Sequence, residues 1–435
     1  MFTKLPQLAA VVLAVAALGL AAFAARSLAG GGQVTLSGAG ADVATDDGTP
    51  GARWGPAMLT FVLRGREVWG TTGARSQPRC LLGPWRPGSP EDMNSLQWSK
   101  DGTMLVYEAT REILETAPSI FQAEYSSPYD VRGPSECVCP IGVLPRLSPD
   151  GSRLACIHSE TADHSVMGDP RLVVVPTRPG GPQGEIEDLS PLIERFINPV
   201  FWAAETTDAE WSPSGRQLVA SMFRIVVIDL DRMTAKELDC GTIPRNTRWS
   251  PDGRRLAFSW SPLMEDSPDG HPVDPCPATE ISVVNRDGTG LANLTNDPRE
   301  DKRPSWSPDG RLIAFLRREH EVEDDDEPEA KPPSTRLLLG EPLPPHYSYE
   351  IWVMNADGTE QRQLTDEVAT DDEPLWSPDG RWIAYSSEGW PNERARLWVV
   401  GLDDSPPQEV AADLQGILGC IAWRPAIEPS PEARE

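Results

Sequence analysis

The chain has 435 residues, and 39% of them are hydrophobic, so it is long enough and apolar enough to bury a large core. Its 39 basic and 66 acidic residues give a formal net charge of −27, which argues against a nucleic-acid binder because that class of protein needs a basic surface. The 44 prolines predict many turns and few long helices, and seven scattered cysteines are too few for a disulfide scaffold.

Residues 1–26 are predicted to be a signal peptide or an N-terminal membrane anchor. Lys4 supplies a positive start, and an uninterrupted apolar run of 18 residues begins at Leu8. Ala22 and Ala24 fit a small-x-small cleavage site, so both a cleaved signal and an uncleaved anchor stay open. Either one carries the rest of the chain across a membrane, so we expect a periplasmic or cell-surface protein that touches the membrane only through this segment.

A Gly-rich stretch follows at 27–56 and is expected to be a flexible linker. From there to residue 425 a short motif recurs, in which Trp-Ser-Pro-Asp-Gly precedes a run of apolar residues. Pro sets the second position of a turn and Gly takes the left-handed position that closes it, so each motif predicts a β-hairpin. Copies of the motif, some of them imperfect, begin at Trp98, Leu147, Trp211, Trp249, Trp306 and Trp376.

Second hairpins are predicted at Asn285–Thr289 and Asn355–Thr359, where the sequence reads Asn-x-Asp-Gly-Thr before a closing strand. Together the two patterns resemble the TolB-type β-propeller repeat, and the resemblance extends over residues 57–425. It implies an all-β propeller of four-stranded blades. The same repeat occurs in TolB, in the propellers of prolyl-oligopeptidase-type peptidases and in many exported proteins, so it implies a fold and not a function. TolB has an additional α/β domain before its propeller, where this chain has the linker.

We predict seven blades, with six as the alternative. Residues 419–425 are typical of a first strand with no hairpin after it, whereas Met58–Leu63 is typical of a second strand with no first strand before it. The C-terminal strand would then complete the first blade and close the ring, with further strands at 67–69 and 79–82. Residues 426–435 are expected to form a disordered, Pro-rich tail.

The repeated tryptophans and aspartates are interpreted as structural residues. Packing between neighbouring blades explains a tryptophan that recurs at one place in the blade, and Asp at the third position of a turn needs no catalytic role. The structural residues are Trp98, Trp211, Trp249, Trp306, Trp376, Trp423, Asp150, Asp252, Asp309 and Asp379.

The large insertions are predicted to lie on one face of the ring, because they fall between the second and third strands of the blades or between blades. They run over 158–170, 190–209, 261–279, 317–348 and 388–394. Loops on a rigid scaffold are where binding usually occurs. The candidate partner-binding residues in or beside them are Trp202, Trp260, His271, His320, His346, Tyr347 and Trp390.

No metal site is predicted, because no two histidines have ligand spacing, and no cofactor is expected. The acidic run 321–329 is interpreted as a solvated loop. A G-x-S-x-G nucleophile elbow is absent from the sequence, which excludes a prolyl-oligopeptidase-type peptidase in this chain alone. We therefore expect a monomeric, non-catalytic scaffold that binds an unknown protein or peptide of the cell envelope through the long-loop face. The alternatives are a propeller-type hydrolase or lyase, and a binder of envelope glycans or small ligands, acting at that face or in the central channel.

Overall fold

A computed structural model describes most of the region between residues 57 and 425. The described ranges are 57–63, 67–82, 92–110, 119–127, 130–131, 136–139, 142–158, 171–177, 186–196, 208–222, 224–241, 243–261, 279–322, 346–366, 374–387, 396–403, 405–412 and 417–425. The predicted signal or anchor, the linker and the C-terminal tail lie outside them. Among the described residues, no helix is long and apolar enough to cross a membrane.

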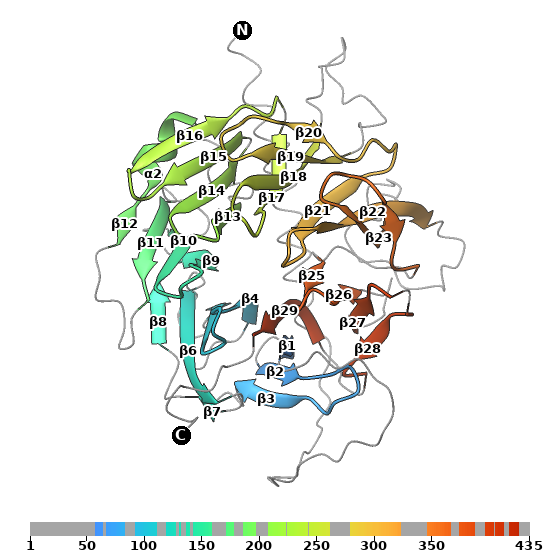
Figure 1. Ribbon diagram of the computed structural model, residues 1–435. Helices are drawn as coiled ribbons and strands as arrows, with labels where there is room; N and C mark the ends of the chain where they lie inside the picture. Colours follow the sequence, from blue (N-terminus) through green and yellow to red (C-terminus); the bar gives the residue numbers. More distant parts are fainter. Residues whose placement is uncertain are drawn as a thin grey trace, which may run out of the picture.

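Seven antiparallel sheets stand around a central axis, which confirms the predicted propeller and its seven blades (Figure 1). From the innermost strand outward, blade 1 consists of β29 (Ile417–Arg424), β1 (Met58–Leu63), β2 (Glu67–Thr71) and β3 (Arg79–Leu82). Blade 2 consists of β4 (Asp92–Trp98), β5 (Met104–Thr110) and β6 (Ser119–Ser127), with β7 (Asp130–Val131) and β8 (Glu136–Cys139) both paired with β6. Blade 3 consists of β9 (Gly142–Leu147), β10 (Arg153–His158), β11 (Arg171–Pro176) and β12 (Glu187–Asp188).

In the same order, blade 4 consists of β13 (Asp208–Trp211), β14 (Gln217–Met222), β15 (Arg224–Asp229) and β16 (Thr234–Leu238), and blade 5 of β17 (Ile243–Trp249), β18 (Arg255–Ser261), β19 (Glu280–Asn285) and β20 (Ala292–Asn293). Blade 6 consists of β21 (Asp301–Trp306), β22 (Leu312–Val322), β23 (His346–Asn355) and β24 (Arg362–Gln363). Blade 7 consists of β25 (Leu375–Trp376), β26 (Trp382–Ser387), β27 (Arg396–Gly401) and β28 (Gln408–Val410). The short helices α2 (Ser190–Ile193) and η3 (Glu194–Phe196) follow β12.

The ring closes as the two ends of the sequence predict. β29 lies antiparallel to β1, with Met58 opposite Arg424 and Leu63 opposite Ile417. The Thr60 hydroxyl donates to the Ala422 carbonyl at 2.7 Å, and both residues are buried. This strand pairing joins the two ends of the propeller sequence and completes the four-stranded sheet of blade 1.

Each Ser-Pro-Asp-Gly turn is held by the same small set of hydrogen bonds. In blade 5, Gly253 N–H donates to the Ser250 carbonyl at 2.8 Å, and the Ser250 hydroxyl donates to Asp252 at 2.6 Å. Gly253 has a φ of +66°, which the missing side chain permits, and a Cβ there would lie 3.5 Å from Pro213 of the preceding turn. The Pro and Gly of successive turns therefore also pack on one another around the ring.

Between blades, apolar clusters form the core, and arginines stack on the repeated tryptophans. One cluster joins blades 3 and 4, and another joins blades 7 and 1. The Arg424 guanidinium lies 4.3 Å from the Trp98 ring and donates to the Gly102 carbonyl, although the residue is only 1% exposed. Arg255 stacks on Trp306 in the same way at 4.8 Å. These contacts hold neighbouring blades in a fixed orientation.

Four of the predicted insertions join the second strand to the third, in blades 3, 5, 6 and 7, so the strand ends from which they start lie on one side of the ring. One predicted insertion, 317–348, is wrong in extent. β22 runs on to Val322 and β23 begins at His346, so the connection is 323–345. The polar residues at the end of β22 read as loop in the sequence, but they pair across a long hairpin with β23.

Candidate functional site

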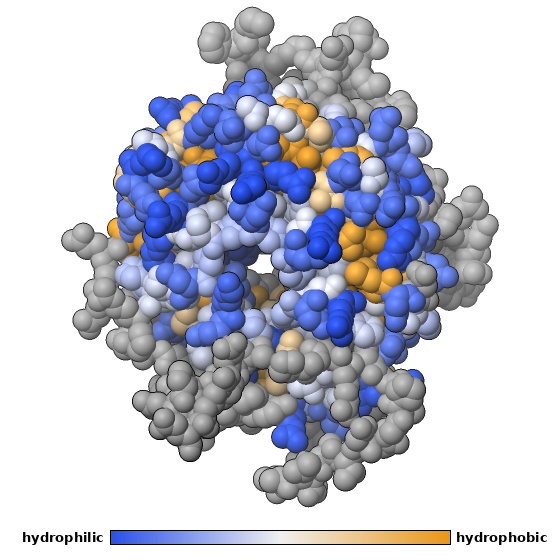
Figure 2. Space-filling view, in the orientation of Figure 1, coloured by the Kyte–Doolittle hydropathy of each residue, from blue (hydrophilic) through white to orange (hydrophobic). Residues whose placement is uncertain are grey.

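The innermost strands surround a channel that contains a cavity of about 470 Å³, and Figure 2 shows the hollow at the centre of the ring. Half of its lining residues occupy one repeated position, the residue immediately before the motif tryptophan, or before Leu147 in blade 3. We call this the ring position. It lies two residues before the Ser of each tight turn, so the cavity lies toward the tight-turn side of the ring. The ring-position residues that line the cavity are Gln97, Arg146, Glu210, Arg248, Leu375 and Ala422.

The cavity wall is divided into two arcs of opposite chemistry. Blades 7, 1 and 2 are neighbours in the ring, and their innermost strands supply an apolar arc. Its residues are Leu375, Trp376, Ile421, Ala422, Trp423, Leu96 and Trp98. Gln97 stands at the border of this arc with blade 3.

Blades 3 to 6 supply the other arc, with Arg146, Glu210, Arg248 and Arg303. Three guanidinium groups and one carboxylate give this arc a net charge of about +2, inside a protein whose formal net charge is −27. A cavity with low-dielectric walls concentrates the field of such a group of charges. The arrangement suits a ligand that carries an anionic group on one side and an apolar group on the other.

Backbone irregularities coincide with the three arginines. The innermost strands of blades 3, 5 and 6 each contain a register shift and a residue in the left-handed region: Leu144 at φ +55°, Asn246 at +51° and Arg303 at +56°. A β-bulge re-aims the side chains beside it, and non-glycine residues in this region carry strain that gathers at functional sites. The Glu108 carboxylate of blade 2 accepts the N–H of Leu144 at 2.9 Å, which holds the first of these bulges.

Hydrogen bonds fix the polar ring-position side chains. Gln97 Oε1 accepts the N–H of Leu147 in the next blade at 2.7 Å, and Glu210 Oε2 accepts the N–H of Trp249 at 2.7 Å. Arg146 and Arg248 each donate from Nη1 to the preceding carbonyl of their own strand, at 3.1 Å in both cases. Because both arginines make the same bond, their guanidinium groups are held in the same way beside the channel.

The motif tryptophans tie the ring together through their indole N–H groups. Each of four indoles donates to the ring-position carbonyl of the preceding blade; the pairs are Trp211 with Arg146, Trp306 with Arg248, Trp376 with Ser305, and Trp423 with Leu375, at 2.8–3.2 Å. Trp98 instead donates to the Thr60 hydroxyl, which bonds Ala422. Trp249 differs, because its indole N–H is buried and has no hydrogen-bond partner among the described residues.

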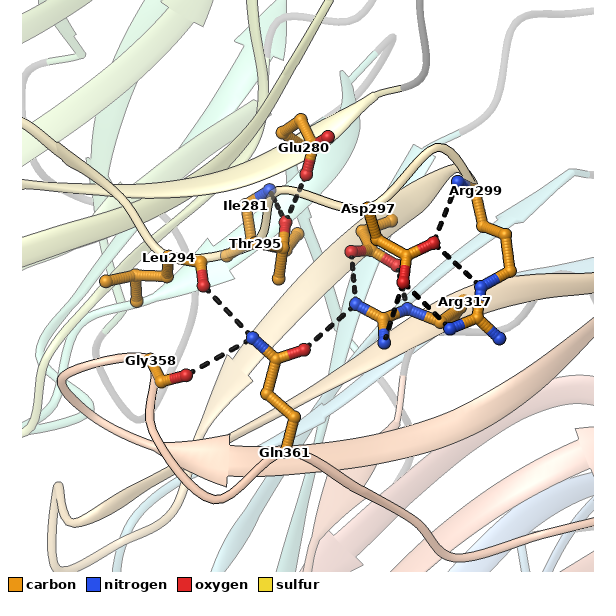
Figure 3. A network of polar contacts seen from close by, with 10 residues as sticks. Glu280, Ile281, Leu294, Thr295, Asp297, Arg299, Arg317, Gly358 and Gln361 are labelled. Atoms are coloured by element: carbon orange, nitrogen blue, oxygen red, sulfur yellow. Dashed lines mark hydrogen bonds and ion pairs between the residues drawn. The ribbon is translucent and has the colours of Figure 1, made fainter.

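A second polar cluster lies between blades 5 and 6 (Figure 3). Asp301 and Arg317 are buried and form a two-pronged ion pair at 2.7 and 2.8 Å. The Arg317 guanidinium also donates to Gln361 Oε1 at 3.1 Å and lies 4.6 Å from the Trp352 ring. Burial raises the pKa of Asp301, and the pairing with Arg317 opposes that shift.

Two further carboxyl groups of this cluster have shifted pKa values. Hydrogen bonding to Arg299 lowers the pKa of Asp297 to about 2. Burial raises the pKa of Glu280 to about 7, although the Thr295 hydroxyl donates to it at 2.6 Å. Because its charged groups pair with one another, we assign this cluster to the joint between blades and not to ligand binding.

The predicted loop-face residues are not brought together as a described site. Trp202, His271 and Trp390 lie outside the described residues. His320, His346 and Tyr347 were predicted in or beside a loop, but they are strand residues, and their register places His320 opposite Ser348 and Tyr347 opposite Glu321. Trp260, on β18, packs against the core cluster that contains Trp249 and Cys240. Its buried indole nitrogen has no hydrogen-bond partner among the described residues.

Sequence reasoning missed the ring position. Its members lie one to a blade and, apart from two arginines, are of different types, so no local motif marks them. Aligning the repeats on their tryptophans and reading the position just before would have found Arg146, Glu210 and Arg248. Among the described residues, no three His, Cys, Asp or Glu side chains gather in a way that would hold a metal ion.

No known family's sequence profile matches this chain. A stretch of 150 residues is 27% identical to the uncharacterized peptidase YuxL of Bacillus subtilis, and it covers 32% of this chain and 21% of that protein. The chain therefore spans only about a fifth of that relative's length. TolB from Acinetobacter baumannii shares 16% identity over 85% of this chain and 67% of its own, with a TM-score of 0.45.

The periplasmic gluconolactonase of Pseudomonas aeruginosa is similar over 85% of this chain and 99% of its own, at 15% identity and a TM-score of 0.50. Likeness at this level shows a shared fold and does not transfer an activity. With seven blades and a ring closed by β29, this chain is a seven-bladed β-propeller, and its repeated turn motif resembles that of the TolB-type propellers.

Proposed function

We propose that this protein is a non-catalytic propeller that works outside the cytoplasm and binds a protein or peptide partner. In this proposal the channel receives a chain end of the partner, with the terminal carboxylate against the arginine arc and an apolar side chain against the tryptophan arc. The observation that carries it is the division of the cavity wall into these two arcs. The N-terminal apolar segment supports the location.

The charge of the protein and of its channel favours a ligand with one or a few negative groups over a polyanion. A polyanion would approach a strongly acidic protein against repulsion, whereas a single carboxylate gains from the local positive field of the channel. A guanidinium is well matched to a carboxylate, because its planar donors meet both carboxylate oxygens. The apolar arc favours a peptide end with an apolar side chain over a glycan, since three tryptophans and two leucines line it.

The lining supports binding and not catalysis. The described cavity wall contains one carboxylate, Glu210, and no His, Ser or Cys. Glu210 already accepts a backbone N–H from the next blade. Acid–base hydrolysis uses a second titratable group within reach of the first, and none lines the described part of this cavity.

Selection from a random peptide library displayed with free carboxyl ends tests the proposal on the full-length chain. We expect enrichment of peptides that end in Leu, Phe or Met, and loss of that enrichment with Arg146→Gln/Arg248→Gln. The exposed Arg216→Gln is the matched control. Two results would overturn the proposal: peptides enriched regardless of their carboxyl end, or the same enrichment in Arg146→Gln/Arg248→Gln (the channel variant).

The side of the ring that carries the long connections is a separate candidate contact for the same partner. A variant with residues 323–345 shortened separates the two surfaces. The channel proposal predicts that the shortened chain selects the same peptide ends. If the shortened chain loses the selection and the channel variant keeps it, the partner binds through the loop face instead.

A further inference from the structure

Two thiols and an imidazole meet between blades 2 and 3, away from the channel. Cys139 ends the outer strand β8 of blade 2, and Cys156 lies in β10, the second strand of blade 3. The two Sγ atoms are 3.5 Å apart, and Cys139 Sγ lies 3.8 Å from Nδ1 of His158, two residues beyond Cys156. Both cysteines are thiols in the structure, and each is only 1% exposed.

The surroundings hold the two sulfur atoms close together. Cys139 and Cys156 belong to one apolar cluster with Val106 and Ile120 of blade 2 and Val173 of blade 3. A disulfide has an S–S distance of about 2.05 Å, so the sulfurs need to approach by about 1.5 Å from 3.5 Å. Side-chain rotation and a small shift of the short strand β8 supply such a movement.

We propose that Cys139 and Cys156 form a disulfide bond that joins blade 2 to blade 3. The remaining described cysteines do not share this arrangement. Cys240 and Cys80 have no other thiol within bonding distance among the described residues, and their pKa values are raised to about 11, with burial as the largest cause.

The chemistry of the pair assigns different roles to the two thiols. Hydrogen bonding from the Cys156 thiol lowers the pKa of Cys139, whereas the same interaction and burial raise the pKa of Cys156. Cys139 is therefore the attacking thiolate, and His158, in the tautomer with a bare Nδ1, accepts its proton. A thiolate and not a thiol is the nucleophile in disulfide exchange.

The oxidant is a disulfide, such as oxidised glutathione or the disulfide of an oxidoreductase. During folding, before Cys139 is buried, its thiolate attacks one sulfur of the oxidant, forms a mixed disulfide and releases one thiolate. Cys156 then gives up its proton, and its sulfur attacks Cys139 and releases the second thiolate. Two protein thiols and one oxidant disulfide thus become one protein disulfide and the two thiols of the reduced oxidant, whose thiolates take up the two protons that the cysteines lose. The bond closes a segment in which the two cysteines are 17 positions apart.

The test uses the full-length chain, refolded with oxidised glutathione or produced in an oxidising compartment, then denatured, alkylated and mapped as peptides without reduction. We expect a peptide that links Cys139 to Cys156, at least a tenfold loss of alkylation at both, and continued alkylation of Cys240. Cys137→Ser should keep the link, and Cys156→Ser should lose it. The oxidised protein should unfold about 4 °C above Cys156→Ser, and a reductant should remove that difference.

Three results would overturn the proposal. The first is alkylation of Cys139 and Cys156 to the same extent as Cys240 after oxidation. The second is a link that uses Cys137 in place of either partner. The third is stoichiometric zinc retained with both thiols reduced, measured by elemental analysis of the purified protein.

Discussion

The ion pair between Asp301 and Arg317 gives the sharpest test of how the blades are held together. Both side chains are almost completely inaccessible to solvent, and two hydrogen bonds join them. Asp301→Asn removes the charge and leaves the guanidinium buried. Removing one partner of a buried pair typically costs about 3–5 kcal/mol. Asp297 lies 3.8 Å from Arg317 and compensates in part, so we expect the lower end, about 3 kcal/mol of unfolding free energy.

Urea denaturation of the full-length protein, followed by tryptophan fluorescence and circular dichroism, measures this cost. The exposed pair of Arg311 and Asp309, at 3.7 Å, is the matched control, and Arg311→Met should cost less than about 0.5 kcal/mol. The double variant Asp301→Asn/Arg317→Met should recover most of the loss, because an apolar side chain can take the place of the guanidinium on the Trp352 ring. A cost below about 1 kcal/mol for Asp301→Asn alone would refute the reasoning.

Three other substitutions test particular interactions. Trp376→Phe breaks the indole bond to Ser305 and should cost about 1 kcal/mol more than Trp249→Phe, whose indole has no acceptor among the described residues; equal costs in urea denaturation would contradict this. Burial raises the pKa of Glu280 to about 7 from its usual 4.5, so the folded state keeps a proton that the unfolded chain releases, and stability falls as pH rises through this window. Glu280→Gln should therefore match the unsubstituted protein near pH 4 and exceed it by about 1 kcal/mol at pH 8, and parallel pH profiles would argue against the shift. Gly310 has a φ of +70°, so Gly310→Ala should cost about 1–2 kcal/mol, and an unchanged thermal midpoint would show that the turn relaxes.

The repeat makes most of the fold predictable from the sequence. Ser-Pro-Asp-Gly specifies its own hairpin, because Ser, Asp and Gly form the turn's hydrogen bonds within five residues of one another. The incomplete blade at each end predicted the closing strand, since neither 419–425 nor Met58–Leu63 can complete a sheet alone. The same local chemistry, repeated in six of the seven blades, was sufficient for the architecture.

The parts that sequence reasoning missed depend on contacts between distant residues. The long hairpin of β22 and β23 pairs Glu321 with Tyr347, and charged residues at the end of a strand resemble a loop when read singly. The left-handed backbone at Leu144 and Asn246 occurs without glycine, so nothing in the sequence marks those bulges. The channel combines one to three residues from each of the seven blades, which only the closed ring brings together.

The channel's preference for a carboxylate is tested most directly by calorimetric titration of the full-length protein with a short N-acetylated peptide ending in Leu. The free acid should bind, and the C-terminal amide of the same peptide should bind at least tenfold more weakly, because the loss of one charge-assisted hydrogen bond costs about 1.5–3 kcal/mol. Arg146→Gln/Arg248→Gln should lose the difference between the two peptides, and Arg216→Gln should keep it. Equal affinity for acid and amide, or no binding of either, would contradict the account.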